Sequence, residues 1–221
     1  MPGRLGFASA TTALVALLAV LLALTVRAVP HTAFYDRNLP WIVARGTALV
    51  ALILLAVLVA AGILISHPLN RTIWRKAKQL LVWHRYLAAF VVALVAVHVV
   101  AIVLDQYAHV SLFGALMPGD AGYRALPVAL GTLSLYAMLL TALTAGYAQK
   151  LPPKVWLYVH RCAFLVFVLA WTHGLLAGSD SATLRPLYVG LAALLLAAAA
   201  TRYWLEIPRT RRVAPDGGKG T

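Results

Sequence analysis

The sequence predicts an all-α integral membrane protein, folded as one bundle of six transmembrane helices. Two observations support this fold class. The chain has 221 residues, of which 62% are hydrophobic and 11% are charged, whereas soluble domains are about half apolar and about a quarter charged. The apolar residues also gather in six runs, each close to the ~20 residues that a helix needs to cross a bilayer.

The six helices are expected at residues 8–26, 42–66, 80–104, 125–148, 155–177 and 184–205. A signal peptide is the alternative for the first run, because Arg4 precedes its apolar core. The run is long for that role, and Arg27 stands where small residues should precede a cleavage site, so an uncleaved helix is favoured. The chain then divides into a first helix with its outer loop (1–41), a helical core (42–205) and a basic, Gly-rich tail expected to be disordered (206–221).

Charge predicts the orientation of the bundle. Lys and Arg outnumber Asp and Glu by 19 to 6, and the positive-inside rule explains this excess without a nucleic-acid partner. The basic, almost acid-free segments are 69–79, 149–154 and the tail, whereas four of the six acids lie in 27–41, 105–124 and 178–183. Both termini are therefore predicted in the cytoplasm, with the protein in the cell membrane. The first loop does not follow this pattern, because it contains or adjoins three arginines: Arg27, Arg37 and Arg45.

Several polar residues have ordinary explanations. The single cysteine, Cys162, rules out an intrachain disulfide and is expected as a small core residue. Three histidines at loops or helix ends are expected to be solvated: His31, His67 and His109. For His31 and His109, which are predicted on the outer side, binding of a metal substrate is a weaker alternative. Solvation is also expected for the outer-loop acids Asp105, Asp120 and Asp180.

Two pairs of histidines interrupt the third and fifth apolar runs. The segment His84–His98 reads HRYLAAFVVALVAVH, and His160–His173 reads HRCAFLVFVLAWTH. Ionisable side chains inside a membrane are costly and usually mark a site. Both helices are predicted to run outward, so the first histidine of each lies near the inner surface and the second near the outer. At 1.5 Å per residue the steps span roughly 21 and 20 Å, so the pairs meet at matching depths.

Each matched pair can supply two axial imidazoles to one iron, with a heme between the facing helices. We therefore predict an inner heme at His84 and His160 and an outer heme at His98 and His173. The helical angle fits less well, because fourteen residues return to one face whereas thirteen leave a separation of about 140°. Zinc is disfavoured because its ligands must converge on one ion, whereas the two histidines of each helix lie roughly 20 Å apart. The plainest alternative is that the histidines join helices by hydrogen bonds.

An arginine follows the inner histidine in both copies. Arg85 and Arg161 can extend to the inner interface, as basic side chains near helix ends do. They can also pair with the propionates of an inner heme, because guanidinium groups suit carboxylates. The two roles are compatible with each other.

With these motifs the chain resembles the ferric reductase-like transmembrane family. That family includes the membrane parts of NADPH oxidases and yeast ferric reductases, and the heme-binding subunit of the bacterial methionine sulfoxide reductase system. The likeness covers about residues 42–205, and the fourteen-then-thirteen histidine spacing is its most specific part. The segment LDQYAHVSLFGALMPGDAGYRALPVALGTL at 104–133 and GSD at 178–180 resemble actinobacterial members.

The resemblance implies two b-type hemes, held by the histidine pairs assigned above, and electron transfer across the membrane. Oxidases and ferric reductases of the family continue into a cytoplasmic flavin and nicotinamide domain, whereas about sixteen residues follow the sixth run here and no Gly-rich dinucleotide fingerprint occurs. No flavin or NAD(P)H site is therefore expected in this chain. The donor would be a separate flavoprotein or membrane quinol, and the acceptor ferric iron, oxygen or an extracytoplasmic redox partner.

Other functions stay open from the sequence. The methionine sulfoxide reductase subunit also lacks a flavin domain but usually lacks an equivalent of His84, which makes a single-heme, quinol-fed subunit the first alternative. A heme-binding membrane protein without redox turnover and a metal-free scaffold are the others. An enzymatic role is expected only as the membrane electron-transfer subunit of an oxidoreductase, since no acid–base constellation is visible.

Overall fold

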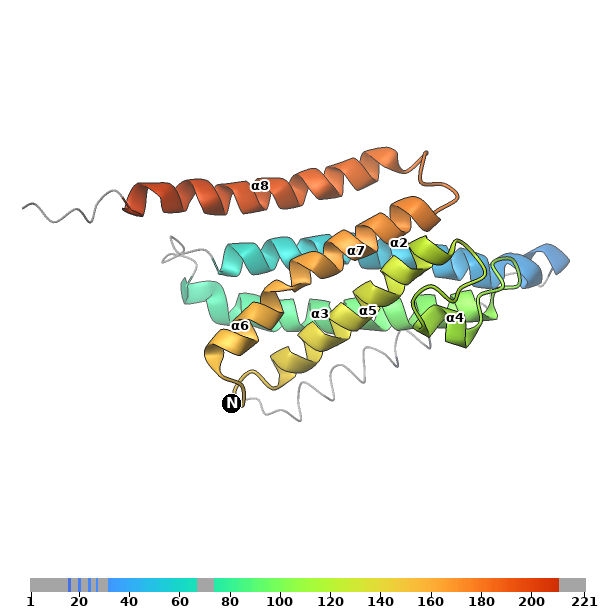
Figure 1. Cartoon of the computed structure of the whole chain (residues 1–221), viewed down its shortest axis with the longest axis horizontal. Coiled ribbons are helices and arrows are strands. Elements are labelled where there is room, and N and C mark those ends of the chain that lie inside the picture. The colour runs from blue at the N-terminus through green and yellow to red at the C-terminus, as the bar shows by residue number, and fades with distance from the viewer. Residues whose placement is uncertain are drawn as a thin grey trace, which may run out of the picture.

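The computed structural model describes residues 32–66 and 74–210, together with the single positions 16, 20, 24 and 27. Within these ranges the side chains of 33–36, 74–78 and 203–210 are not described. The described chain is helical and contains no strand, which confirms the all-α fold class (Figure 1). The helices are α2 Ala33–Ile65, α3 Trp74–Leu104, α4 Leu112–Leu116, α5 Ala125–Gly146, α6 Pro153–Arg161, α7 Ala163–Ala177 and α8 Arg185–Thr210.

Four segments of the described chain are long and apolar enough to cross a membrane. They are Arg37–Ile65, Gln79–Leu104, Ala125–Gly146 and Pro153–Ala177. They match the predicted second to fifth spans, so the protein is a multi-pass membrane protein. The predicted first span, 8–26, lies outside the described residues. The predicted sixth is helical as α8, but Arg185 and Arg202 bracket its uncharged stretch at 186–201, which is shorter than the ~20 residues of a full span. Six spans therefore stay a prediction.

Two segments predicted as loops contain helix. Helix α2 begins at Ala33 and runs through Pro40, which the sequence analysis placed in a loop. Pro40 lies beyond the first turn of α2, so it removes the hydrogen bond that an amide at this position would donate four residues back, yet the backbone is helical on both sides of it. In the outer loop 105–124 a short helix, α4, begins at Ser111, whose hydroxyl accepts a hydrogen bond from the Gly114 amide at 2.9 Å. A turn follows α4 at Pro118–Gly119, with Gly119 at φ 92°.

The fifth span is interrupted at Cys162, where α6 ends and α7 begins. The Cys162 amide donates to the Val159 carbonyl at 3.0 Å, three residues back instead of the four of an α-helix. Figure 1 shows α6 and α7 as two helices that meet at a bend. The Cys162 side chain is exposed, so the prediction that it is a core residue was wrong. In a membrane protein, an apolar run has a lipid-facing side as well as a core side.

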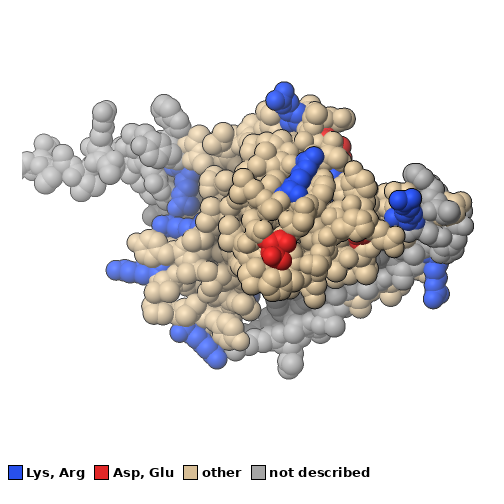
Figure 2. Space-filling view, turned by 45° about the vertical axis from the view of Figure 1, so that its right-hand side comes forward, with Lys and Arg blue, Asp and Glu red and all other residues tan. Residues whose placement is uncertain are grey.

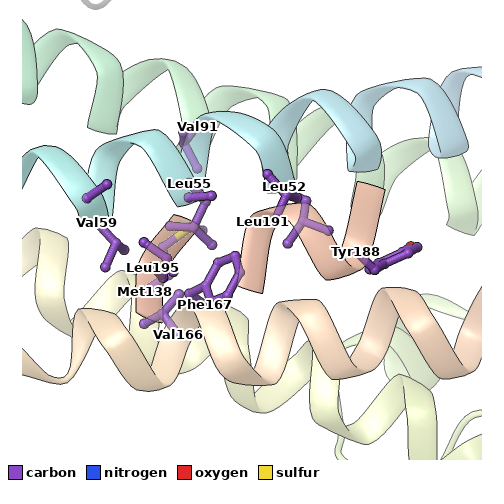
Figure 3. Close-up of a cluster of buried hydrophobic side chains, with 12 residues drawn as sticks. Leu52, Leu55, Val59, Val91, Met138, Val166, Phe167, Tyr188, Leu191 and Leu195 are labelled. Carbon is purple, nitrogen blue, oxygen red and sulfur yellow. The ribbon is translucent and has the colours of Figure 1, made fainter. Parts of the chain in front are cut away.

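The core lies where α2, α3, α5, α7 and α8 approach one another. Its buried side chains include Leu55, Val91, Met138, Phe167 and Leu195, drawn in Figure 3. Helix α2 packs along α3 and α8, and α5 packs along α7. Hydrogen bonds reinforce the contact between α5 and α7 and join α7 to α8. The buried Ser134 hydroxyl of α5 donates to the Val166 carbonyl of α7 at 2.9 Å, and the Trp171 indole donates to the Tyr188 carbonyl of α8 at 2.9 Å.

Candidate functional site

The structure brings the four histidines of α3, α6 and α7 together as the two predicted pairs. The ring centroids of His84 and His160 are 6.2 Å apart, with an angle of 63° between the ring planes. Those of His98 and His173 are 6.3 Å apart, with an angle of 74°. The expected off-face position of the second pair does not arise, because the break at Cys162 interrupts the helix between His160 and His173.

Both outer histidines are anchored through Nδ1. His98 Nδ1 lies 2.8 Å from the carbonyl oxygen of Ala44 on α2, and His173 Nδ1 lies 2.7 Å from the carbonyl oxygen of Pro127 on α5. A carbonyl oxygen can only accept, so Nδ1 must carry the proton in each ring. Nε2 is then unprotonated in a neutral imidazole and has a free lone pair. This is the state of a histidine prepared to bind a metal through Nε2.

A cavity of about 190 Å³ surrounds the outer pair. His98 and His173 line it from two sides, and most of its other lining residues are apolar. Polar groups enter it from three further segments, through Arg45 of α2, Tyr123 of the outer loop and Tyr188 of α8. The cavity thus combines an apolar wall with two imidazoles and a few polar groups at its margin, which is typical of a cofactor site.

Gly131 lets α5 approach the outer pair closely. A β-carbon built at Gly131 would lie 2.8 Å from His173 Nδ1 and 2.9 Å from its Cε1, closer than real contacts of this kind. The α5 backbone therefore supplies both the space for the imidazole ring, at Gly131, and the acceptor that orients it, at Pro127.

The inner pair has different surroundings. Nδ1 of His84 and Nδ1 of His160 are both buried and have no hydrogen-bond partner within the part of the chain that the structure describes. The ring of His160 instead stacks on Trp156 of α6, with centroids 5.4 Å apart and an angle of 19°. A β-carbon built at Gly62 of α2 would lie at ordinary contact, 3.4 Å, from Cε1 of His84. The inner rings are held by packing rather than by hydrogen bonds.

The two predicted basic partners of the inner site, Arg85 and Arg161, are exposed. Each follows its histidine directly, so their backbones lie at the level of the inner pair. Among the described side chains neither forms an ion pair, and the described acids Asp105, Asp120 and Asp180 all lie in the loops at the outer end. Figure 2 likewise shows Lys and Arg at the left end of the molecule, with no described acid beside them.

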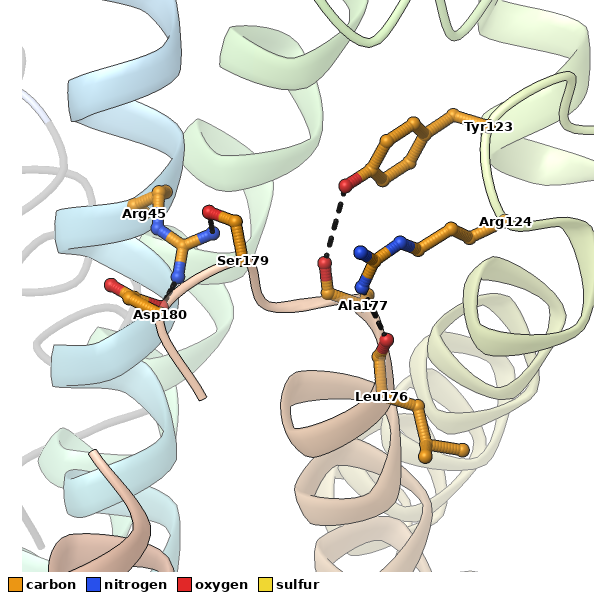
Figure 4. Close-up of polar contacts among 7 residues, drawn as sticks. All are labelled: Arg45, Tyr123, Arg124, Leu176, Ala177, Ser179 and Asp180. Carbon is orange, nitrogen blue, oxygen red and sulfur yellow. Dashed lines mark hydrogen bonds and ion pairs between the residues drawn. The ribbon is translucent and has the colours of Figure 1, made fainter. Parts of the chain in front are cut away.

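The outer end contains an ion pair that the sequence analysis missed. Arg45 of α2 pairs with Asp180 in the α7–α8 turn and donates to the Ser179 hydroxyl at 3.3 Å (Figure 4). Its guanidinium also lies 5.1 Å from the centroid of the Trp41 ring. A charged residue within an apolar run was the available signal. The pairing explains why Arg45 can lie at the predicted outer end as an exception to the positive-inside rule, since Asp180 opposes its charge.

The same turn is held from the other side. Arg124 donates to the Leu176 carbonyl at 2.7 Å, and the Tyr123 hydroxyl donates to the Ala177 carbonyl at 3.5 Å (Figure 4). These contacts join the outer loop to the end of α7, just beyond His173. The turn that closes α7 is therefore fixed by cationic side chains from α2 and from the outer loop.

In the outer loop the expectation for Asp105 is corrected and the expectation for His109 is confirmed. Asp105 is 4% exposed, and its Oδ2 accepts from the amides of Tyr107 at 3.0 Å and Ala108 at 2.6 Å. The prediction that Asp105 is solvated was therefore wrong, because its carboxylate ends α3 by binding backbone amides. His109 is exposed, as expected. His31 and His67 lie outside the described residues.

Beyond the two pairs, the described residues contain no group of three or more His, Cys, Asp or Glu side chains placed to hold a metal ion. Any metal at these sites would take two protein ligands per site. The residues fit a heme on three observations: the trans-like separation of the rings, the free Nε2 atoms of the outer pair and the close approach of Gly131.

Comparison with protein-family models gives one match, to the ferric reductase like transmembrane component, over residues 45–171. The matched segment contains His84, His98 and His160, and His173 follows two residues after it. No curated protein and no solved structure matches the chain. The match covers more than half of the chain and suggests a role in membrane electron transfer. The protein therefore belongs to the ferric reductase-like transmembrane family.

Proposed function

We propose that this protein is a diheme transmembrane electron-transfer subunit. His84 and His160 would hold an inner b-type heme, and His98 and His173 an outer one. Electrons would enter from a cytoplasmic flavoprotein or membrane quinol and leave to an extracytoplasmic acceptor, which is ferric iron, oxygen or a redox partner. Both termini would be cytoplasmic in the cell membrane, as the basic inner end favours.

The observation that carries the proposal is the separation of the imidazole rings. A metal–imidazole bond is about 2.0 Å long and the ring centroid lies roughly 1 Å further on, so two rings on opposite sides of one ion have centroids about 6 Å apart. Two rings at a tetrahedral angle would have centroids roughly 5 Å apart. The observed 6.2 and 6.3 Å favour pairs that would hold one heme iron between two imidazoles.

Heme, when bound, would supply an iron that accepts and releases one electron. The residues of this chain orient and insulate it. Ala44 and Pro127 fix the outer imidazoles through their carbonyls. Between the two pairs lie buried side chains such as Val91 and Phe167, seven positions after His84 and His160. They exclude water from the path between the sites.

Arg85 and Arg161 would pair with the propionates of the inner heme. Support comes from their place next to His84 and His160 and from the lack of a competing ion pair in the described part of the chain. A guanidinium paired with a carboxylate at the membrane surface satisfies both charges where each would otherwise extend into water.

One observation favours a second candidate, a single-heme subunit fed by quinol. In the described ranges only the outer pair combines anchored Nδ1 atoms with a lined cavity, whereas the Nδ1 atoms of the inner pair have no partner there. In that case the outer heme alone would be retained, and the inner histidines would pack between helices.

The test is a reduced-minus-oxidised spectrum of the purified protein, with heme quantified per chain. The variants are His84→Ala and His98→Ala, and the matched control is His109→Ala in the exposed outer loop. Two hemes in the parent and the control, with one lost in each site variant, support the diheme subunit. One heme that survives His84→Ala supports the single-heme alternative. Absence of any Soret band after expression with ample heme would contradict both.

A further inference from the structure

We infer that the outer site holds its iron at a lower reduction potential than the inner site. The asymmetry arises from the hydrogen bonds of the axial imidazoles and from the charges beside them. The inference rests on the proposed diheme function. It adds to that function which of the two sites holds the electron at rest.

The first contribution comes from the imidazoles. The outer rings donate Nδ1–H to the carbonyls of Ala44 and Pro127 at 2.8 and 2.7 Å, whereas Nδ1 of His84 and of His160 has no acceptor among the described residues. Donating Nδ1–H makes the opposite nitrogen a stronger base. A stronger axial donor stabilises ferric over ferrous iron, so it lowers the potential. The protein therefore favours the oxidised state more strongly at the outer site.

The second contribution comes from the arginines. A nearby positive charge stabilises the reduced iron, which carries one positive charge fewer. Arg85 and Arg161 flank the inner pair, and no described acid lies at that end of the bundle. Arg45 lines the outer cavity, but Asp180 pairs with it and opposes its charge (Figure 4). Arg85 and Arg161, which have no ion pair with a described acid, would therefore offset the negative propionates at the inner site, and this raises the inner potential more than the outer one.

Both contributions act in the same direction, so an electron that enters the protein rests at the inner site. Transfer outward reduces the outer iron by one electron as the inner iron is oxidised by one. The interior-negative membrane potential drives this step, because the electron moves toward the positive side. The outer site then meets its acceptor as the stronger reductant of the two, which suits acceptors that are hard to reduce.

The test is a redox titration of the purified, heme-loaded full-length protein and of its one-site variants. Soret absorption and electron paramagnetic resonance monitor the titration. His84→Ala leaves the outer site and His98→Ala leaves the inner one. We expect the midpoint potential of the outer site to be lower than that of the inner site by at least about 59 mV, which corresponds to a tenfold equilibrium constant for the transfer of one electron. Equal or reversed midpoints with two hemes bound overturn this inference alone. Fewer than two hemes in the parent overturns the proposed function as well.

A second variant assigns the midpoints without altering a ligand. Asp180→Asn removes the charge that opposes Arg45, so it should raise the lower midpoint of the two-heme protein and leave the higher one in place. The matched control is Asp120→Asn, an exposed outer-loop acid without an ion pair among the described residues, which should move neither. A shift of the higher midpoint in Asp180→Asn would assign that midpoint to the outer site and overturn the inference.

Discussion

Gly131 lies against the imidazole of His173, so closely that a β-carbon at position 131 would stand 2.8 Å from Nδ1. The carbonyl that orients this same nitrogen belongs to Pro127, one helical turn earlier on α5. The missing side chain and the hydrogen bond therefore act together. Without the glycine, α5 could not come near enough to α7 for the Pro127 carbonyl to accept from the histidine.

Gly131→Ala should accordingly disable the outer site. The added methyl group would displace the His173 ring and lengthen its bond to Pro127, and we expect the outer heme to be lost while the inner heme stays. Heme per chain and the reduced-minus-oxidised spectrum measure this. The control is Gly146→Ala on the same helix, where nothing lies within 4 Å of the added atom. Retention of both hemes with an unchanged spectrum in Gly131→Ala would show that the ring is not confined there.

Trp156 is predicted to support the inner site by packing. Its ring stacks on His160, whose Nδ1 has no hydrogen bond to any described residue. Trp156→Leu should therefore weaken heme retention at the inner site by about tenfold, the lower end of the range for groups that orient metal ligands. Competition with apomyoglobin for heme measures the loss. Trp83→Leu, at a side chain that is 71% exposed, should have no such effect, and equal losses in both variants would contradict the prediction.

The Ser134 hydroxyl is predicted to stabilise the contact between α5 and α7. It is buried and donates to the Val166 carbonyl at 2.9 Å. Interhelical hydrogen bonds in membrane proteins contribute about 0.6 kcal/mol on average, with a maximum of about 1.7 kcal/mol. Ser134→Ala should therefore lower the free energy of unfolding in detergent by about 1 kcal/mol. Thr144→Ala, which removes a hydroxyl bonded within its own helix, serves as the comparison and should change stability less.

Adjacent leucines test whether α8 belongs to the core. Leu195 is 1% exposed and lies in the central cluster, whereas Leu196 is 65% exposed. Leu195→Ala removes packing contacts and should destabilise the bundle by about 2 kcal/mol, near the lower limit for such truncations. Leu196→Ala faces away from the core and should be nearly neutral. Equal effects of the two variants on detergent-induced unfolding would mean that α8 does not pack as described.

The sequence predicted the helices and the histidine pairs because both depend on local or periodic properties. Apolar runs close to the bilayer thickness indicate spans, and the second to fifth predicted spans matched to within a few residues except where α2 begins early, at Ala33. Four histidines inside such runs stood out because ionisable groups are rare there. Their spacing along two helices that run in the same direction was enough to match His84 with His160 and His98 with His173, as their ring contacts confirm.

What only the tertiary structure decided concerns groups that the sequence does not distinguish. The acceptors of the outer histidines are the backbone carbonyls of Ala44 and Pro127, and every residue has a carbonyl, so no residue type indicates which one will lie beside a ring. The break at Cys162, the burial of Asp105 and the pairing of Arg45 with Asp180 likewise depend on segments that meet only after folding. Helix periodicity could therefore place the four imidazoles in depth, but the packing of α2 and α5 against them determines their orientation.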